Sequence, residues 1–281
     1  MVTLPGSVVG RYERFSLYNS PYPAHDGGNA IDLYPGENGG LAPSPVAGKV
    51  LDTRTVACPS RPYAAEEDHL ILVDTDDYVA RILHVDPAVS AGDRVAIGDP
   101  LGQLVRSGFF GRWVDDHIHL GFRPPDANHY RASGSLPLAL DVDVRALSWD
   151  GTGTVVATGP EHVLLDAPTP DSDGTRFAAL ASDEGIPLDG GLAHYAGGGT
   201  FRSYEGLISL LDCPVGIAAG RDVTWADVAI TANGRRATGL SLFATRMPVG
   251  AKLVFHKGHD FAVGDSLTVG VNPTADPVQL G

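Results

Sequence analysis

Lysine is scarce in this sequence, and only Lys49, Lys252 and Lys257 are present. Acidic residues outnumber basic ones, which gives a formal net charge of −14 at pH 7. A surface of this kind repels nucleic acid and anionic lipid, so nucleic-acid binding is excluded as a function. Such a surface stays soluble where salt screens the self-repulsion. The composition therefore predicts a halophilic source organism, and a protein that unfolds when it is diluted into low salt.

Cysteine is also scarce, and long apolar runs are absent from the sequence. Cys58 and Cys213 are far apart and have no CxxC partner, so we expect two isolated buried thiols. No apolar run is long enough to span a membrane. The first residues lack a basic region followed by an apolar core, so no signal peptide is visible and the default expectation is a cytoplasmic protein.

Glycine and proline are abundant, with 35 and 21 residues in a chain of 281. Together with short apolar runs separated by turn signals, they predict an all-β protein with antiparallel sheets. The stretch Trp149–Gly153 has the composition of a domain boundary. We therefore predict a first domain over residues 1–149 and a β-rich C-terminal domain of unknown role over residues 150–281.

A pair of histidines lies in a predicted strand over Val114–Phe122. His117 and His119 alternate there with Ile118 and Leu120. Alternate residues of a strand point to the same face, so both imidazoles project into one cavity while the aliphatic residues face the core. Such a pair suits one metal ion, with one imidazole as a ligand and the other beside it.

Further candidate residues lie upstream. His25 lies in a Gly- and Pro-rich loop that leads into a predicted strand over Ala30–Tyr34. Asp32 is embedded in that strand, where it either caps a turn or holds a cation. His84 ends the second strand of a predicted hairpin formed by residues 69–73 and 78–85. The aromatic segment 107–113 either lines a cleft wall or packs under a loop.

The order His25, Asp32, His84 and His117-x-His119 resembles the zinc metallopeptidases of the LytM/lysostaphin type. The resemblance covers roughly residues 20–125. It includes a strand entry at 42–50 and the Gly-Asp turns between His84 and Gly102. It implies a LytM-like β-sheet or barrel and a Zn²⁺ cofactor. It also implies a zinc endopeptidase acting on peptidoglycan or another cell-wall-like or Gly-containing peptide.

The resemblance also implies roles for single residues. His25, Asp32 and His119 are the implied zinc ligands, and His84 and His117 are the implied catalytic pair beside the metal. Six residues separate His25 from Asp32, where the family usually has three. An outward loop at Gly27, Gly28 and Asn29 would bring His25 and Asp32 to the relative position that the family's shorter spacing gives. Asp26 remains an alternative oxygen ligand.

Two other functions follow from the same residues. The longer spacing before Asp32 leaves open a catalytically inactive LytM-like module that binds or regulates a partner. The Gly-Asp turns are also similar to those of lipoyl and biotinyl carriers. A carrier needs a lysine in an exposed hairpin, and none of the three lysines lies in a suitable turn.

Overall fold

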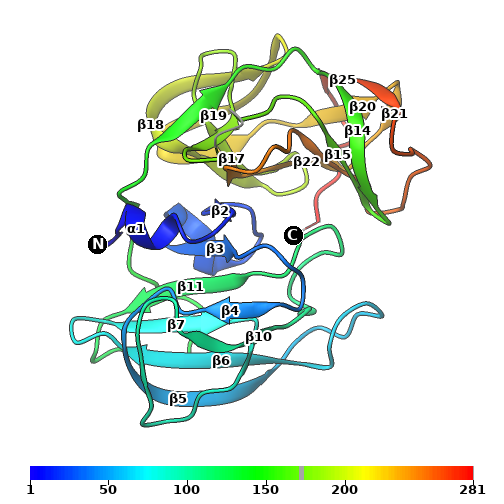
Figure 1. The fold of residues 1–281 in the computed structure, drawn as a ribbon. Coiled ribbons are helices and arrows are strands. Elements are labelled where there is room, and N and C mark those ends of the chain that lie inside the picture. The colour runs from blue at the N-terminus through cyan, green and yellow to red at the C-terminus, as the bar shows by residue number, and fades with distance from the viewer. Residues whose placement is uncertain (171–173, 281) are drawn as a thin grey trace. The chain divides into compact units, whose positions relative to one another are not determined.

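The computed structural model describes residues 1–170 and 174–280, whose regular secondary structure is almost entirely β-strand (Figure 1). The predicted all-β class is confirmed, because most strand pairs are antiparallel and the described helices are one α-helical turn and one 3-10 segment. Within the described residues, no helix is both long and apolar enough to cross a bilayer. Cys213 is buried, but Cys58 is only half-buried, so the prediction of two buried thiols is wrong for Cys58.

The chain divides into two units. The first unit comprises Met1–Phe15 and Asn29–Val142. The second comprises Ser16–Gly28 and residues from Asp143 onward. The short segment Ser16–Gly28 therefore groups with the C-terminal half, although it lies between two parts of the first unit in sequence. The predicted boundary near residue 149 stays a prediction.

The first unit is built on a curved antiparallel sheet. Its strand order is β2-β3-β11-β7-β6-β5-β9, and β4, β10 and β8 form a smaller sheet. The elements of this unit are β1 (Val2–Leu4), α1 (Gly6–Val9), β2 (Arg14–Ser16), β3 (Ala30–Tyr34), β4 (Leu41–Pro43), β5 (Gly48–Ala57), β6 (Glu67–Asp74), β7 (Val79–Leu83), β8 (Val85–Pro87), β9 (Arg94–Val95), β10 (Pro100–Leu104), β11 (Ile118–Arg123) and β12 (Leu138–Leu140).

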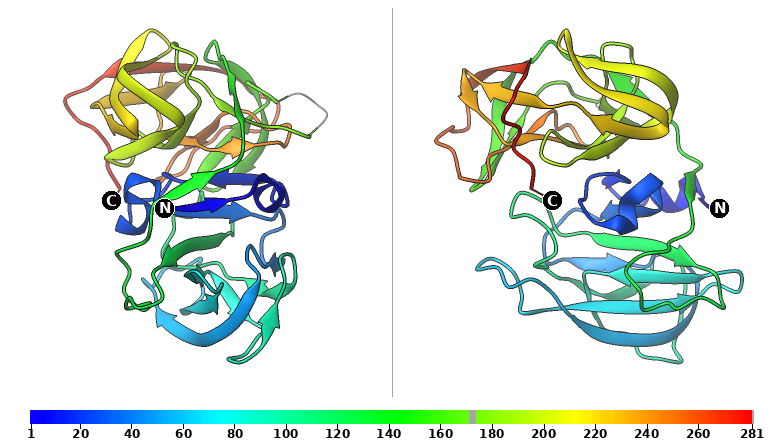
Figure 2. Two further views of the ribbon diagram at one scale, coloured as in Figure 1. Left: turned by 90° about the vertical axis from the view of Figure 1, so that its left-hand side faces the viewer. Right: turned by 180° about the vertical axis from the view of Figure 1, so that it is seen from behind.

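The second unit has a ten-stranded sheet whose order starts β19-β18-β17-β22, and Figure 2 shows the long β18–β19 hairpin curling along its length. Its core includes Val163, Leu188, Val215 and Leu253, which are fully buried. The elements of this unit are the 3-10 segment η1 (Pro23–Gly28), β13 (Val144–Leu147), β14 (Thr152–Gly159), β15 (His162–Leu165), β16 (Phe177–Leu180), β17 (Leu188–Leu192), β18 (Gly197–Leu210), β19 (Cys213–Trp225), β20 (Val228–Ala232), β21 (Arg235–Arg236), β22 (Gly239–Leu242), β23 (Ala244–Thr245), β24 (Lys252–Val254) and β25 (Ser266–Pro273).

Strand β11 lies between β3 and β7 in the first unit, and all six of its residues are buried. Ile118 and Leu120 are fully buried, as expected for one face of a strand with an apolar core beneath it. The other face carries His119 at one end and Arg123 at the other. A buried central strand of this kind holds its side chains in fixed positions, which suits a functional site.

The strand starts at Ile118 rather than at Val114, so the predicted strand is too long at its N-terminal end. The reason is the guanidinium of Arg106, which donates hydrogen bonds to the carbonyl oxygens of Gly111, Arg112 and Val114. Those carbonyls are therefore bonded to a side chain rather than to a neighbouring strand. His117 lies just before the strand and is still buried, with 2% of its surface exposed.

Candidate metal centre

His119 and Asp32 lie directly opposite one another on neighbouring strands. The register of β11 against β3 pairs His119 with Asp32, and both side chains project from the same face of the sheet. His119 Nδ1 lies 3.0 Å from Asp32 Oδ1. His117 approaches the same carboxylate, with 3.6 Å between its Nε2 and Asp32 Oδ2. One buried carboxylate is therefore shared by two imidazoles.

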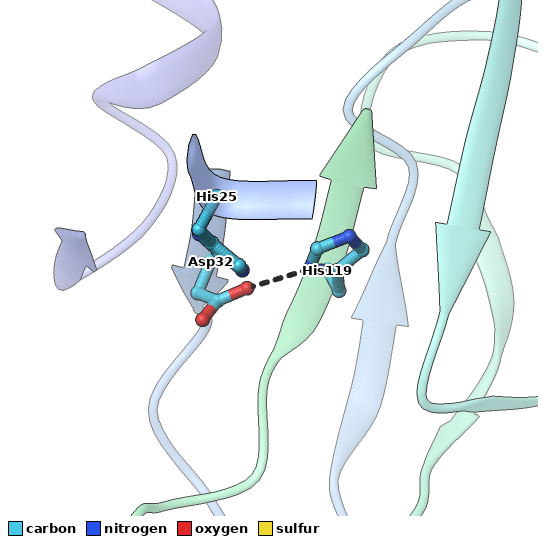
Figure 3. A group of neighbouring side chains, drawn as sticks. All are labelled: His25, Asp32 and His119. Atoms are coloured by element: carbon cyan, nitrogen blue, oxygen red, sulfur yellow. Dashed lines mark hydrogen bonds and ion pairs between the residues drawn. The ribbon is translucent and has the colours of Figure 1, made fainter. Parts of the chain in front are cut away.

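His25 joins this pair. Its ligand atom and those of Asp32 and His119 all lie within 4.8 Å of one another, and all three side chains are buried (Figure 3). His25 Nδ1 donates to the carbonyl oxygen of Leu17 at 2.8 Å, which leaves Nε2 as the ring nitrogen with a lone pair. The six-residue spacing is bridged by the turns of η1, in which Gly27 and Gly28 have φ values of 63° and 64°. Asp26, the alternative ligand, is exposed and lies outside this group.

The donor set fits a zinc ion. Two imidazole nitrogens and one carboxylate oxygen form the mixed N and O set of a catalytic zinc site, in which a fourth position stays open. Two ligands at about 2.0–2.1 Å from a tetrahedral ion lie roughly 3.3 Å apart. The observed 3.0 Å between His119 and Asp32 is close to this spacing. Small side-chain movements are therefore enough to accommodate the ion.

His84 and His117 lie next to this group. The ring centroids of His84 and His117 are 5.0 Å apart, and those of His84 and His119 are 5.9 Å apart. His84 follows β7 directly and has a φ of 67°, a conformation that L-residues rarely adopt. His117 Nδ1 donates to the carbonyl oxygen of Asp115 at 2.8 Å. The structure thus brings all five predicted residues together, and their roles remain predictions.

Asp68 is a member of the site that the sequence did not reveal. It lies in β6 and is fully buried. Its Oδ2 accepts hydrogen bonds from His84 Nδ1 and Ser107 Oγ, both at 2.6 Å, and its Oδ1 accepts from the backbone N–H of His69 and of His84. Burial opposes ionisation of Asp68, but the His84 charge and these hydrogen bonds lower its pKa to about 2. An ionised Asp68 holds a proton of His84 on Nδ1, which leaves Nε2 as the ring nitrogen that is able to exchange a proton.

Aromatic rings enclose His117. The ring centroids of Phe110 and His117 are 4.7 Å apart, and those of Tyr34 and His117 are 5.0 Å apart. Phe110 also lies 5.2 Å from His84, and its carbonyl oxygen accepts a hydrogen bond from the hydroxyl of Tyr63 at 3.1 Å. Segment 107–113 therefore contributes an aromatic ring beside the two histidines, and the choice between a cleft wall and packing under a loop stays a prediction. Aromatic rings exclude water and strengthen electrostatic interactions within a site.

Comparison with protein families identifies matches to both halves of the chain. The model of the N-terminal domain of a family of unknown function, DUF8155, matches residues 3–140. The model of the C-terminal domain of the same family matches residues 145–272. The chain belongs to the DUF8155 family. No curated protein matches this DUF8155 chain.

Two solved structures are similar to this chain at low sequence identity. One is a point mutant of the catalytic domain of the prophage-encoded M23 protein EnpA from Enterococcus faecalis, with 18% identity over 38% of this chain and 78% of that one, at a TM-score of 0.28. The other is lysostaphin in solution, with 12% identity over 84% of this chain and 89% of that one, also at a TM-score of 0.28. Both likenesses are weak, so the site stands on its own geometry.

Proposed function

We propose that this DUF8155 protein is a zinc-dependent metallopeptidase that hydrolyses a peptide bond in a cell-wall-like or Gly-containing peptide. The observation that supports the proposal most is the convergence of His25, Asp32 and His119 within 4.8 Å, with two further histidines beside them. A zinc ion bound by these three residues would polarise a peptide carbonyl and lower the pKa of a water molecule from about 15.7 towards about 7.

The two neighbouring histidines supply the proton transfers that hydrolysis needs. The Nδ1 atoms of His84 and His117 are both engaged, with Asp68 and with the Asp115 carbonyl respectively. Each ring therefore presents Nε2 as its reactive atom. One histidine takes the proton of the attacking water, and the other stabilises the developing oxyanion or protonates the leaving amine. The burial of both rings keeps their positions fixed during these steps.

A cleavage assay tests this proposal. Protein purified in high salt and loaded with zinc is incubated with glycine-containing peptides and with peptidoglycan fragments, and products are identified by mass spectrometry. His117→Ala and His84→Ala should each lower cleavage by about 10²–10⁴-fold, in the range that general acid–base groups contribute. His256→Gln changes a histidine outside the five-residue group and should leave cleavage unchanged.

The alternative is a module that binds metal or a partner without catalysis. The longer spacing between His25 and Asp32 is the feature that favours it. The same assay separates the two functions. Zinc bound with no cleavage of any peptide would support the binding module, and cleavage lost in both histidine variants would support the peptidase.

A further inference from the structure

Two arginines are buried side by side in the first unit, away from the histidines. Arg81 on β7 is 4% exposed, and Arg123 at the end of β11 is 1% exposed. Arginine is almost never buried to this degree unless an opposite charge pairs with it. Burial, together with the smaller effect of the Arg123 charge, lowers the pKa of Arg81 to about 10. The two guanidinium groups therefore repel one another in a site with little solvent.

The strand register explains why the two side chains meet. Arg81 of β7 is paired with Gly121 of β11, and Arg123 lies two residues beyond Gly121. Residues opposite each other, and residues two apart on one strand, project from the same face of a sheet. The position opposite Arg81 is a glycine, so no side chain from β11 neutralises the charge there.

The hydrogen bonds of the pair do not supply a negative charge. Arg81 Nε donates to the carbonyl oxygen of His129 at 2.6 Å. Arg123 Nη2 donates to three successive carbonyl oxygens at 2.9–3.3 Å, those of Arg131, Ala132 and Ser133. Among the described residues, no carboxylate forms an ion pair with either arginine.

Three hydrogen-bond donors at or near the two arginines have no acceptor among the described residues. Arg123 Nε and Nη1 are shielded from solvent and have no hydrogen-bond partner among the residues that the structure describes. The same is true of Ser135 Oγ, which lies 2.9 Å from the point that a Cβ on Gly121 would occupy. Buried donors without an acceptor are costly, and a buried charge without a counter-charge costs more. Two positive charges and three unused donors are the features of an anion site.

We propose that Arg81, Arg123 and Ser135 bind a small monovalent anion of the size of chloride. The low exposure of both arginines favours a halide over a substrate carboxylate, because a peptide would need an open path to the guanidinium groups. The site is separate from the proposed metal centre. Arg123 is four residues beyond His119 on β11, which is roughly 13 Å at about 3.3 Å per residue. The proposal therefore stands or fails independently of peptidase activity.

Thermal unfolding in matched salts tests the proposal. Wild type is unfolded in sodium chloride and in sodium gluconate at the same high concentration, because gluconate screens charge equally but is too large for the site. The expected midpoint is roughly 5 °C higher in chloride, as for a ligand present far above its Kd. Arg123→Gln should lose this difference. Equal midpoints for wild type in the two salts, or an undiminished chloride effect in Arg123→Gln, would overturn the proposal.

A second variant keeps the test decisive if Arg123→Gln does not fold. Gly121→Glu combined with Ser135→Ala places a carboxylate opposite Arg81 and removes the hydroxyl that a side chain at 121 would meet. This double variant should fold in gluconate with a midpoint at least as high as that of wild type and should show no chloride effect. Diffraction from a bromide-soaked crystal of wild type should show an anomalous peak between the two guanidinium groups. A double variant that keeps the full chloride effect, or a crystal without that peak, would contradict the assignment.

Discussion

Asp68 Oδ2 accepts a 2.6 Å hydrogen bond from His84 Nδ1 in a fully buried pair. The backbone N–H of His84 donates to the other oxygen of the same carboxylate at 3.1 Å. Asp68 thus fixes the ring of His84, its tautomer and its left-handed backbone conformation together. In the proposed hydrolysis Asp68 acts as a positioning residue, because it touches His84 and not the substrate.

Replacing Asp68 by Asn should change the tautomer of His84 without changing the fold. An Asn amide donates a hydrogen bond to His84 Nδ1, so the ring proton moves to Nε2 and that atom can no longer accept a proton. We expect peptide cleavage to fall by about 10²–10⁴-fold while zinc content stays the same. Nitrogen-15 NMR of the histidine side chains reports the tautomer directly.

Ser107→Ala is the matched control for this variant. It removes a hydrogen bond to the same Asp68 oxygen, which Ser107 Oγ donates at 2.6 Å, but leaves the His84 contact in place. It should therefore keep the Nδ1–H tautomer and most of the cleavage activity. An unchanged tautomer in Asp68→Asn would refute the positioning role, whether or not the protein is a peptidase.

Acid stability should also depend on Asp68. Its pKa is lowered from 3.8 to about 2 in the folded protein, so this carboxylate stabilises the fold above about pH 4 and that stabilisation is lost as pH falls through about 2. A shift of this size corresponds to about 2 kcal/mol. The difference in unfolding free energy between wild type and Asp68→Asn should shrink by about this amount from about pH 5 to about pH 2. Parallel pH curves for the two proteins would contradict this origin of acid sensitivity.

Strand periodicity predicted that His117 and His119 share a face, and the resemblance to LytM/lysostaphin-type peptidases implied the grouping with His25, Asp32 and His84. The alternation of His117 and His119 with Ile118 and Leu120 indicated one functional face. The register that sets His119 against Asp32 is a property of the sheet and is visible only in the structure. The strand β3, expected over Ala30–Tyr34, is present with those bounds.

Other features could not be predicted, because they depend on contacts between distant parts of the chain. Asp68 was one of several acidic residues in a polar segment, and nothing local distinguishes it from Glu66 or Glu67. Its contact with Ser107 joins residues 39 positions apart. The shortened start of β11 similarly follows from the Arg106 guanidinium, a side-chain contact that no strand propensity describes.

Low ionic strength should destabilise the protein. The net charge of −14 produces self-repulsion that salt screens, with a Debye length of about 3 Å at 1 M and about 30 Å at 0.01 M. We expect the unfolding midpoint to rise with sodium gluconate concentration, a salt that does not fill the proposed anion site. A midpoint that is independent of gluconate concentration would contradict adaptation of the surface to high salt.

The most direct test of the proposed metal centre is zinc content per chain, measured on protein purified in high salt and dialysed against trace zinc. Wild type should hold close to one zinc ion, and His119→Ala and Asp32→Ala should each hold almost none. Asp26→Ala is the matched control and should keep the metal, because Asp26 is exposed and lies outside the three-residue group. Wild type without zinc, or loss of zinc in Asp26→Ala but not in Asp32→Ala, would contradict the proposed site.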